Sequence, residues 1–292
     1  MTLAAQILVD GFVISALYGM GAIGFTLIFG VTGVLNLAHG AILVIAAMVG
    51  WFVTTHMGGH HWLGALAGIS AAVVAAYWTY GMIVVPITRS RRIPSEEKEI
   101  FILTATLLWG IIIQGALDYA FSSNPVTSPP LVTGVTQVLG VRTPRNELLI
   151  GAIAWIVIGL LWAFVTRTRT GKALQAASMS PMGLALVGFD LNRVFLIVWG
   201  VYGILAGVAG VLLSSFLGAS ADQAGDLTGS AFSIVVLGGL GSVSGSLAAA
   251  YVIGYFETIT AYLVSPAIRE LPALLLVVLI LVLRPHGIFG RR

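Results

Sequence analysis

Long runs of apolar residues dominate this chain, and their length limits its fold more than any other feature. A helix needs about 20 mostly apolar residues to cross a lipid bilayer. Runs of this kind lie near residues 11–31, 36–55, 63–86, 100–121, 147–165, 193–217, 228–262 and 268–284. Charged residues make up only 9% of the 292 residues, whereas a soluble domain carries roughly a quarter. We therefore predict an all-α polytopic membrane protein, a single domain over residues 1–292 with about eight or nine transmembrane or re-entrant helices.

The run at 228–262 is too long for one crossing and is interrupted by "GGLGSVSGS" at 238–246. A broken helix exposes backbone polar groups that lipid cannot satisfy, so such breaks occur where protein or a water-filled cavity surrounds them. We expect two shorter helices here, which either cross separately or form a re-entrant hairpin. The candidates for a transport pathway in this break are Gly238, Gly239, Gly241 and Ser242.

The basic residues are unevenly distributed among the connections. Of the 14 Lys and Arg residues, eleven lie in the connections 87–99 and 166–193 or at the C-terminus. Because cytoplasmic loops are enriched in Lys and Arg, we expect the N-terminus outside and the C-terminus in the cytoplasm. Residues 122–146 then form an external loop, which is either a lid or docking surface or a solvated connector. The N-terminus lacks the basic region of a cleaved signal peptide, so we expect its first apolar run to be retained as a span.

The predicted cytoplasmic loop at 166–192 carries a helical pattern of its own. Basic residues are followed by "ALQAAS", a good helix-forming stretch. Ser180 and Pro181 suit the N-cap and the first position of a second short helix, which would end at Gly188. Two short helices beneath the membrane favour a docking surface for a cytoplasmic partner. The alternative is a basic interfacial linker that lies on lipid headgroups.

The stretch "GVTGVLNLAHG" at 30–40 places two polar side chains, Asn36 and His39, in a very apolar region. The topology puts a turn here, at the cytoplasmic break between the first two spans. At such a break the two side chains either cap the helix ends or line the pathway of a solute. We favour the capping role, with the stretch shaping an inner gate, and keep both residues as pathway candidates.

Three further polar residues lie in the apolar runs. Polar and ionisable groups at membrane depth are costly and are functional candidates by default. Asp118 lies near the outer end of its span, where it can reach the interface, so we expect a structural role at least as readily as a solute contact. Gln114, one helical turn earlier, and Glu257 are predicted to line the pathway.

Signatures of an enzyme are missing from the sequence. "TGKA" at 170–173 lacks the earlier glycine, the following Ser or Thr and the preceding strand of a phosphate-binding loop. His60 and His61 are adjacent in a predicted external loop and do not form a metal constellation. The chain has no cysteine, which excludes disulfides and thiolate metal sites. We predict no catalytic residue, no metal site, no cofactor in this chain and no nucleic-acid partner.

Several motifs, in order along nearly the whole chain, resemble one known family. They are "GVTGVLNLAHG" (30–40), "TGKALQAASMSPMGLALVGFDLNRV" (170–194), "GVAGVLL" (207–213), "VVLGGLGSVSGSLAAAYVIG" (235–254) and "LVLRPHGIFG" (281–290). These motifs resemble the permease subunits of bacterial branched-chain amino acid ABC transporters, and more narrowly the H-type subunit of LIV-type systems. One position departs from the pattern: Ala41 stands where many relatives have an acidic residue, which weakens any substrate assignment based on a carboxylate there.

The resemblance implies a multi-pass protein of the bacterial inner membrane that works with several partners. These would be an identical or paralogous permease subunit, two cytoplasmic ATPases that hold ATP and Mg²⁺, and an external solute-binding protein. The family's coupling region corresponds here to Gly171–Gly188. The residues implied to couple this chain to the ATPases are Lys172, Ala177, Pro181, Ala185 and Gly188.

We therefore expect an importer subunit that moves branched-chain or other neutral amino acids into the cytoplasm and is not itself an enzyme. Urea, amides and small aromatic or organic acids are alternative cargoes within the same family. Two other classes also remain open, an ion-coupled secondary transporter and a channel for a small solute.

Overall fold

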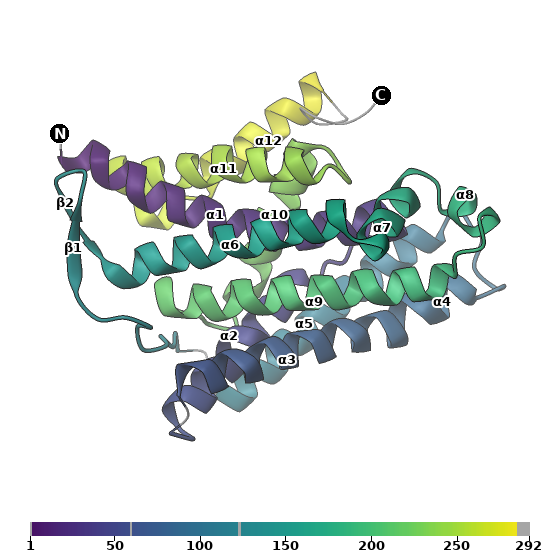
Figure 1. The fold of residues 1–292 in the computed structure, drawn as a ribbon, viewed down its shortest axis with the longest axis horizontal. Helices are drawn as coiled ribbons and strands as arrows, with labels where there is room; N and C mark the ends of the chain where they lie inside the picture. Colours follow the sequence, from purple (N-terminus) through teal and green to yellow (C-terminus); the bar gives the residue numbers. More distant parts are fainter. Residues whose placement is uncertain (1, 59, 122–123, 285–292) are drawn as a thin grey trace.

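Helices form most of the chain in the computed structural model, which describes residues 2–58, 60–121 and 124–284 (Figure 1). The longer helices are α1 (Thr2–Thr32), α2 (His39–Thr55), α3 (His61–Thr79), α5 (Lys98–Phe121), α6 (Arg145–Arg167), α9 (Leu191–Phe216), α10 (Gln223–Gly238), α11 (Val243–Leu263) and α12 (Leu271–Leu283). The shorter ones are the π-helix η1 (Tyr80–Val84), α4 (Val85–Arg89), α7 (Arg169–Met179), α8 (Pro181–Leu186) and the 3₁₀-helix η2 (Pro266–Ile268). The end of the last family motif, residues 285–290, lies outside the described residues, as do Arg291 and Arg292.

The helices confirm the prediction of a polytopic membrane protein. Within the described residues, five segments are long and apolar enough to cross a membrane: α1, the continuous α3–η1–α4, α5, α6 and α9. The apolar helix α2 is shorter, with 17 residues. The total of eight or nine segments and the orientation of the termini stay predictions.

Helix α1 is the centre of the bundle. It packs against α6, α9, α10 and α11, and 78% of its most apolar stretch is buried. A helix that is apolar on all sides is stable only when it is surrounded in this way.

Small residues allow the neighbouring helices to approach closely. A Cβ atom on Gly203 or Gly207 of α9 would lie 2.8 or 2.7 Å from the backbone of α3. A Cβ atom on Gly210 would lie 2.1 Å from the carbonyl oxygen of Leu43 in α2. Close backbone packing of this kind is typical of membrane bundles, where the hydrophobic effect does not drive helix association.

The segment at 228–262 is indeed two helices. Helix α10 ends at Gly238 and α11 begins at Val243, and the turn between them uses positive φ angles at Gly239 (92°) and Gly241 (83°). Glycine adopts such angles without steric cost. Ser242 caps α11, since its side chain accepts a hydrogen bond from the Gly245 N–H at 3.1 Å.

A proline explains the π-helical turn within the third span. Pro86 lacks an N–H and its ring displaces the carbonyl of the preceding turn. The Val85 N–H correspondingly bonds to the Tyr80 carbonyl, five residues earlier. The helix widens for one turn and then continues as α4 to Arg89.

The expectation of an all-α chain needs one correction. Strands β1 (Val135–Val138) and β2 (Val141–Pro144) pair antiparallel inside the predicted loop 122–146. Helix α6 begins at Arg145, so this loop ends slightly earlier than expected. The hairpin lies beside the start of α1, at the opposite end of the bundle from α7 and α8 (Figure 1). We call these two regions the hairpin end and the short-helix end.

Candidate functional site

The candidate site is built around the interruption between α1 and α2. Helix α1 ends at Thr32, and Gly33 follows with φ of +70° and donates its N–H to the Phe29 carbonyl at 2.8 Å. A left-handed glycine directly after a helix is a common stop signal. Asn36 organises the start of α2, because its side-chain oxygen accepts from the Ala38 N–H at 3.2 Å and its carbonyl accepts from the His39 N–H at 3.2 Å.

Asn36 and His39 share one partner, Tyr202 of α9. The Asn36 amide donates to the Tyr202 hydroxyl at 3.1 Å, and His39 Nδ1 lies 3.0 Å from the same hydroxyl. All three side chains are at most 1% exposed. The two polar residues of the motif therefore belong to one buried hydrogen-bonded group.

The depth of this group differs from the sequence prediction. The motif was expected at the cytoplasmic break between two spans, but Tyr202 lies near the middle of the 26-residue α9. Leu37 donates its N–H to Thr106 Oγ1 at 3.1 Å, well inside the 24-residue α5. The chain thus turns back into the bundle after α1, and α2 starts midway along the neighbouring helices. Backbone groups at that depth need partners within the protein, which Asn36 and Thr106 provide.

Gly40 brings α2 against α10. Its N–H donates to Thr228 Oγ1 at 2.9 Å, and a Cβ atom would lie 2.0 Å from the Ala224 carbonyl oxygen. Only glycine fits where two backbones approach so closely. Each conspicuous residue of "NLAHG" therefore makes a specific contact inside the bundle: Asn36 and His39 bond to Tyr202, and Gly40 packs against α10.

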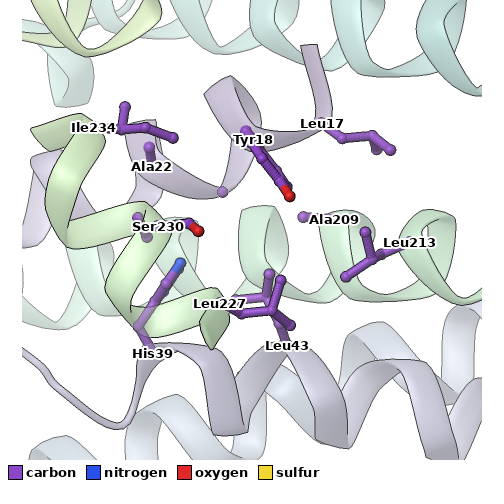
Figure 2. A pocket seen from close by; sticks show the side chains of 12 residues that line it. Leu17, Tyr18, Ala22, His39, Leu43, Ala209, Leu213, Leu227, Ser230 and Ile234 are labelled. Atoms are coloured by element: carbon purple, nitrogen blue, oxygen red, sulfur yellow. The ribbon is translucent and has the colours of Figure 1, made fainter. Parts of the chain in front are cut away.

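A small cavity of about 20 Å³ lies on one side of His39 (Figure 2). Its wall is largely apolar, with Tyr18, Ser230 and His39 as the polar residues. The Tyr18 hydroxyl donates to Glu257 Oε2 at 2.9 Å, and the Glu257 side chain is 3% exposed. Glu257 is thus buried behind Tyr18 and does not itself line the cavity.

A larger groove of about 450 Å³ runs between α5 and α10 and reaches Leu37 in the interruption and Ala41 in the first turn of α2. Its volume is in the range of sites for small molecules. The open space comes partly from Gly225 and Gly229, where a Cβ atom would have no neighbour within 4 Å. Gln114 lines this groove together with Thr228.

The predicted pathway residues therefore fall in three places. Asn36 and His39 meet at Tyr202, Glu257 joins them only across the small cavity, and Gln114 lies in the groove on the other side of the interruption. The glycine turn after α10 lines neither space. Its residues hold a tight contact, since a Cβ on Gly238 would lie 2.4 Å from Gly245, and Gly241 lies against Gly30 of α1.

The short-helix end has the local structure that the sequence predicted. Ser180 caps α8 by accepting from the Gly183 N–H at 3.0 Å, Pro181 begins the helix, and Gly188 follows it with φ of +89°. Lys172, Pro181 and Gly188 are exposed and Ala185 is half-buried, whereas Ala177 is fully buried. The methyl group of Ala177 therefore packs inside this chain, and the coupling role of these five residues stays a prediction.

Sequence reasoning missed the hydroxyl groups that complete the site. Tyr18, Tyr202, Thr106 and Thr228 lie in otherwise apolar helical runs, where a single hydroxyl reads as part of the span. The position of Tyr202 at the centre of a span, in "WGVYGIL", was the signal that could have identified it as a member of the polar site. Its pairing with Asn36 spans 166 residues of sequence and is visible only in the fold.

A model of the branched-chain amino acid transport system permease component matches residues 7–283 of this chain. The chain is 27% identical to the high-affinity branched-chain amino acid transport system permease protein LivH of Escherichia coli K12, over 98% of this chain and 95% of that protein. It is 28% identical to the corresponding permease protein BraD of Pseudomonas aeruginosa, over the same shares.

A solved structure, PsaBC from Streptococcus pneumoniae in complex with Fab, superposes with a TM-score of 0.52 at 14% identity and covers 94% of this chain and 91% of that chain. This likeness concerns the fold alone. Since the family model spans almost all the helices described above, the chain belongs to the family of branched-chain amino acid transport system permease components.

Proposed function

We propose that this chain is a pathway subunit of an ABC importer that moves branched-chain or other neutral amino acids into the cytoplasm across the bacterial inner membrane. The observation that carries the proposal is the match to LivH and BraD over 98% of this chain and 95% of each of those proteins. The whole chain then acts as one permease domain, and its relatives are permease proteins rather than enzymes.

The groove between α5 and α10 is the proposed path of the solute. It is large enough for a small molecule, and it pairs apolar walls with the polar groups of Gln114 and Thr228. Apolar walls suit an aliphatic side chain, while the few polar groups suit the amino acid's polar end. A groove open along one side becomes a closed path only when another protein covers it, which supports pairing with a second permease subunit.

The short-helix end is the proposed contact with two cytoplasmic ATPases, which would hold ATP and Mg²⁺. Its large apolar side chains are unusually exposed, since Met179, Met182, Leu186 and Val187 are each at least 71% exposed. Contiguous exposed apolar groups outside the membrane-crossing helices typically mark protein contacts. The orientation predicted from the basic residues puts this end in the cytoplasm and the hairpin end outside, where a solute-binding protein would dock.

The test is uptake by the complete complex in proteoliposomes, with its ATPases, its partner permease and the solute-binding protein supplied on the outside. We expect uptake of leucine that requires ATP, with weak competition from urea, amides and aromatic acids. A preference for one of those compounds would replace the amino acid as cargo while leaving the importer mechanism in place. Uptake without ATP by this chain alone would favour a channel, and ATP-independent uptake that an uncoupler abolishes would favour an ion-coupled transporter.

The role of the groove is tested by filling it. Gly229→Leu places a side chain into the groove and should abolish most ATP-dependent uptake without loss of the assembled complex. Gly159→Leu is the matched control, because Gly159 is exposed on α6 and a Cβ there also meets nothing within 4 Å. Equal uptake by the two variants would contradict the proposed path.

A further inference from the structure

The protonation of His39 follows from its neighbours. The Asn36 amide donates to the Tyr202 hydroxyl oxygen, so the single proton of that hydroxyl is available for another acceptor. His39 Nδ1, at 3.0 Å, is the acceptor within reach. A neutral imidazole that accepts at Nδ1 carries its proton on Nε2.

That second nitrogen is without a partner. His39 Nε2 is buried and has no hydrogen-bond partner among the described residues. Buried donors are nearly always satisfied by protein or by ordered water. Figure 2 shows the nitrogen pointing into the small cavity, toward Ser230 and away from the α2 backbone.

The cavity has the size and the polar groups to supply the missing acceptor. Its volume is about 20 Å³, and roughly 10–15 Å³ is enough for one water molecule. Across the cavity from His39 lie the hydroxyl groups of Tyr18 and Ser230. The Tyr18 proton is donated to Glu257, so the Tyr18 oxygen keeps lone pairs free to accept.

We propose that this cavity is a binding site for a single water molecule. The water accepts a hydrogen bond from His39 Nε2–H and donates to the hydroxyl oxygens of Tyr18 and Ser230. It satisfies the buried nitrogen with the two to four polar partners that a buried water requires.

The water joins two hydrogen-bonded groups into one continuous series of hydrogen bonds. The order of donation is Asn36 to Tyr202, Tyr202 to His39, His39 to water, water to Tyr18, and Tyr18 to Glu257. Every donor in this series of hydrogen bonds points toward the Glu257 carboxylate, and hydrogen bonds aligned in this way strengthen one another. Helices α1, α2, α9 and α11 are thereby connected through side chains in the interior of the bundle. The inference does not depend on which solute is transported.

The tautomer of His39 is the first test. Solid-state NMR of the full-length protein in lipid, labelled at histidine, resolves which ring nitrogen carries the proton, and a His39→Gln sample assigns the signal. We expect the neutral form protonated at Nε2 near pH 7. A proton on Nδ1 would reverse the donation from Tyr202 and overturn the proposal.

The water itself is tested by a cryo-EM map of the assembled complex in which other buried waters are resolved. Density is expected within hydrogen-bonding distance of His39 Nε2 and the Tyr18 hydroxyl. An empty cavity in such a map would refute the site.

The connection is tested by a double-mutant cycle in thermal unfolding of the complex. Tyr18→Phe and Tyr202→Phe each remove one hydroxyl and keep the ring. Because either change interrupts the same series of hydrogen bonds, the Tm loss of the double variant should be smaller than the sum of the single losses. Tyr251→Phe combined with Tyr202→Phe is the control and should be additive, since Tyr251 bonds to Trp155 outside this network. Additive losses in both pairs would show that the two groups are independent.

Discussion

Gly40 allows the sharpest test of the fold, because the atoms around it leave no room for even one methyl group. In Gly40→Ala, the new Cβ would lie 2.0 Å from the Ala224 carbonyl oxygen, 2.7 Å from Thr228 Oγ1 and 2.8 Å from the Thr228 nitrogen. Two of these three atoms belong to the α10 backbone, so no side-chain rotation relieves the overlap. Helix α10 must move away from α2.

The expected loss of stability has two parts. Forcing an extra carbon into a packed interior costs about 1–3 kcal/mol. The movement also breaks the hydrogen bond from the Gly40 N–H to Thr228, worth about 1 kcal/mol. We therefore expect Gly40→Ala to lower the free energy of unfolding by about 2–4 kcal/mol, a fall in Tm of roughly 4–16 °C at 2–4 °C per kcal/mol.

The assay is intrinsic-fluorescence thermal unfolding of the purified complex in detergent and again in lipid nanodiscs. Gly115→Ala is the matched control, because Gly115 also lies in a helix but its Cβ would meet nothing within 4 Å. That control should be neutral or slightly stabilising, since alanine favours a helix over glycine. A Tm for Gly40→Ala within about 1 °C of the control would refute the close approach of α2 and α10.

Three further predictions follow from other parts of the molecule. Tyr202→Phe leaves the Asn36 amide and His39 Nδ1 without their shared partner and should cost about 1–3 kcal/mol, measured by chemical unfolding; an unchanged midpoint would contradict the shared bond. Gly239→Ala forces a side chain into a φ of +92° and should cost about 1–2 kcal/mol, whereas an equally stable variant would mean that the α10–α11 turn is not held at this angle. Gly188→Val at the short-helix end should raise the ATP hydrolysed per leucine transported, and an unchanged ratio would remove this turn from the coupling surface.

The sequence supported the local structure well where a single segment carries its own signal. The Ser180 cap, the Pro181 start and the Gly188 stop of α8 lie where they were predicted, because capping depends on residues three or four apart. The break between α10 and α11 was likewise predicted from a cluster of glycines in a run too long for one span.

The candidate site was predicted only in part, because its members are distant in sequence. Asn36 and His39 were singled out as polar groups in an apolar region, but their depth was wrong. The expected topology assigned the connection after the first span to a membrane surface, because span lengths alone do not show that the chain turns back into the bundle at this point. The burial of Ala177 was not predicted for a related reason, since the motif does not say which side of a short helix faces inward.

Composition and the length of the apolar runs were sufficient to determine that this chain crosses a membrane. A helix that spans a bilayer needs about 20 mostly apolar residues, and such runs are visible in the sequence itself. Ordered motifs were sufficient to indicate its family. Packing decided the rest: the contact between the Gly40 and Ala224 backbones sets where α2 meets α10, and the hydroxyl of Tyr202 joins two residues more than 160 positions away. Such contacts form between helices that approach within a few ångströms, and no short stretch of sequence records which helices those are.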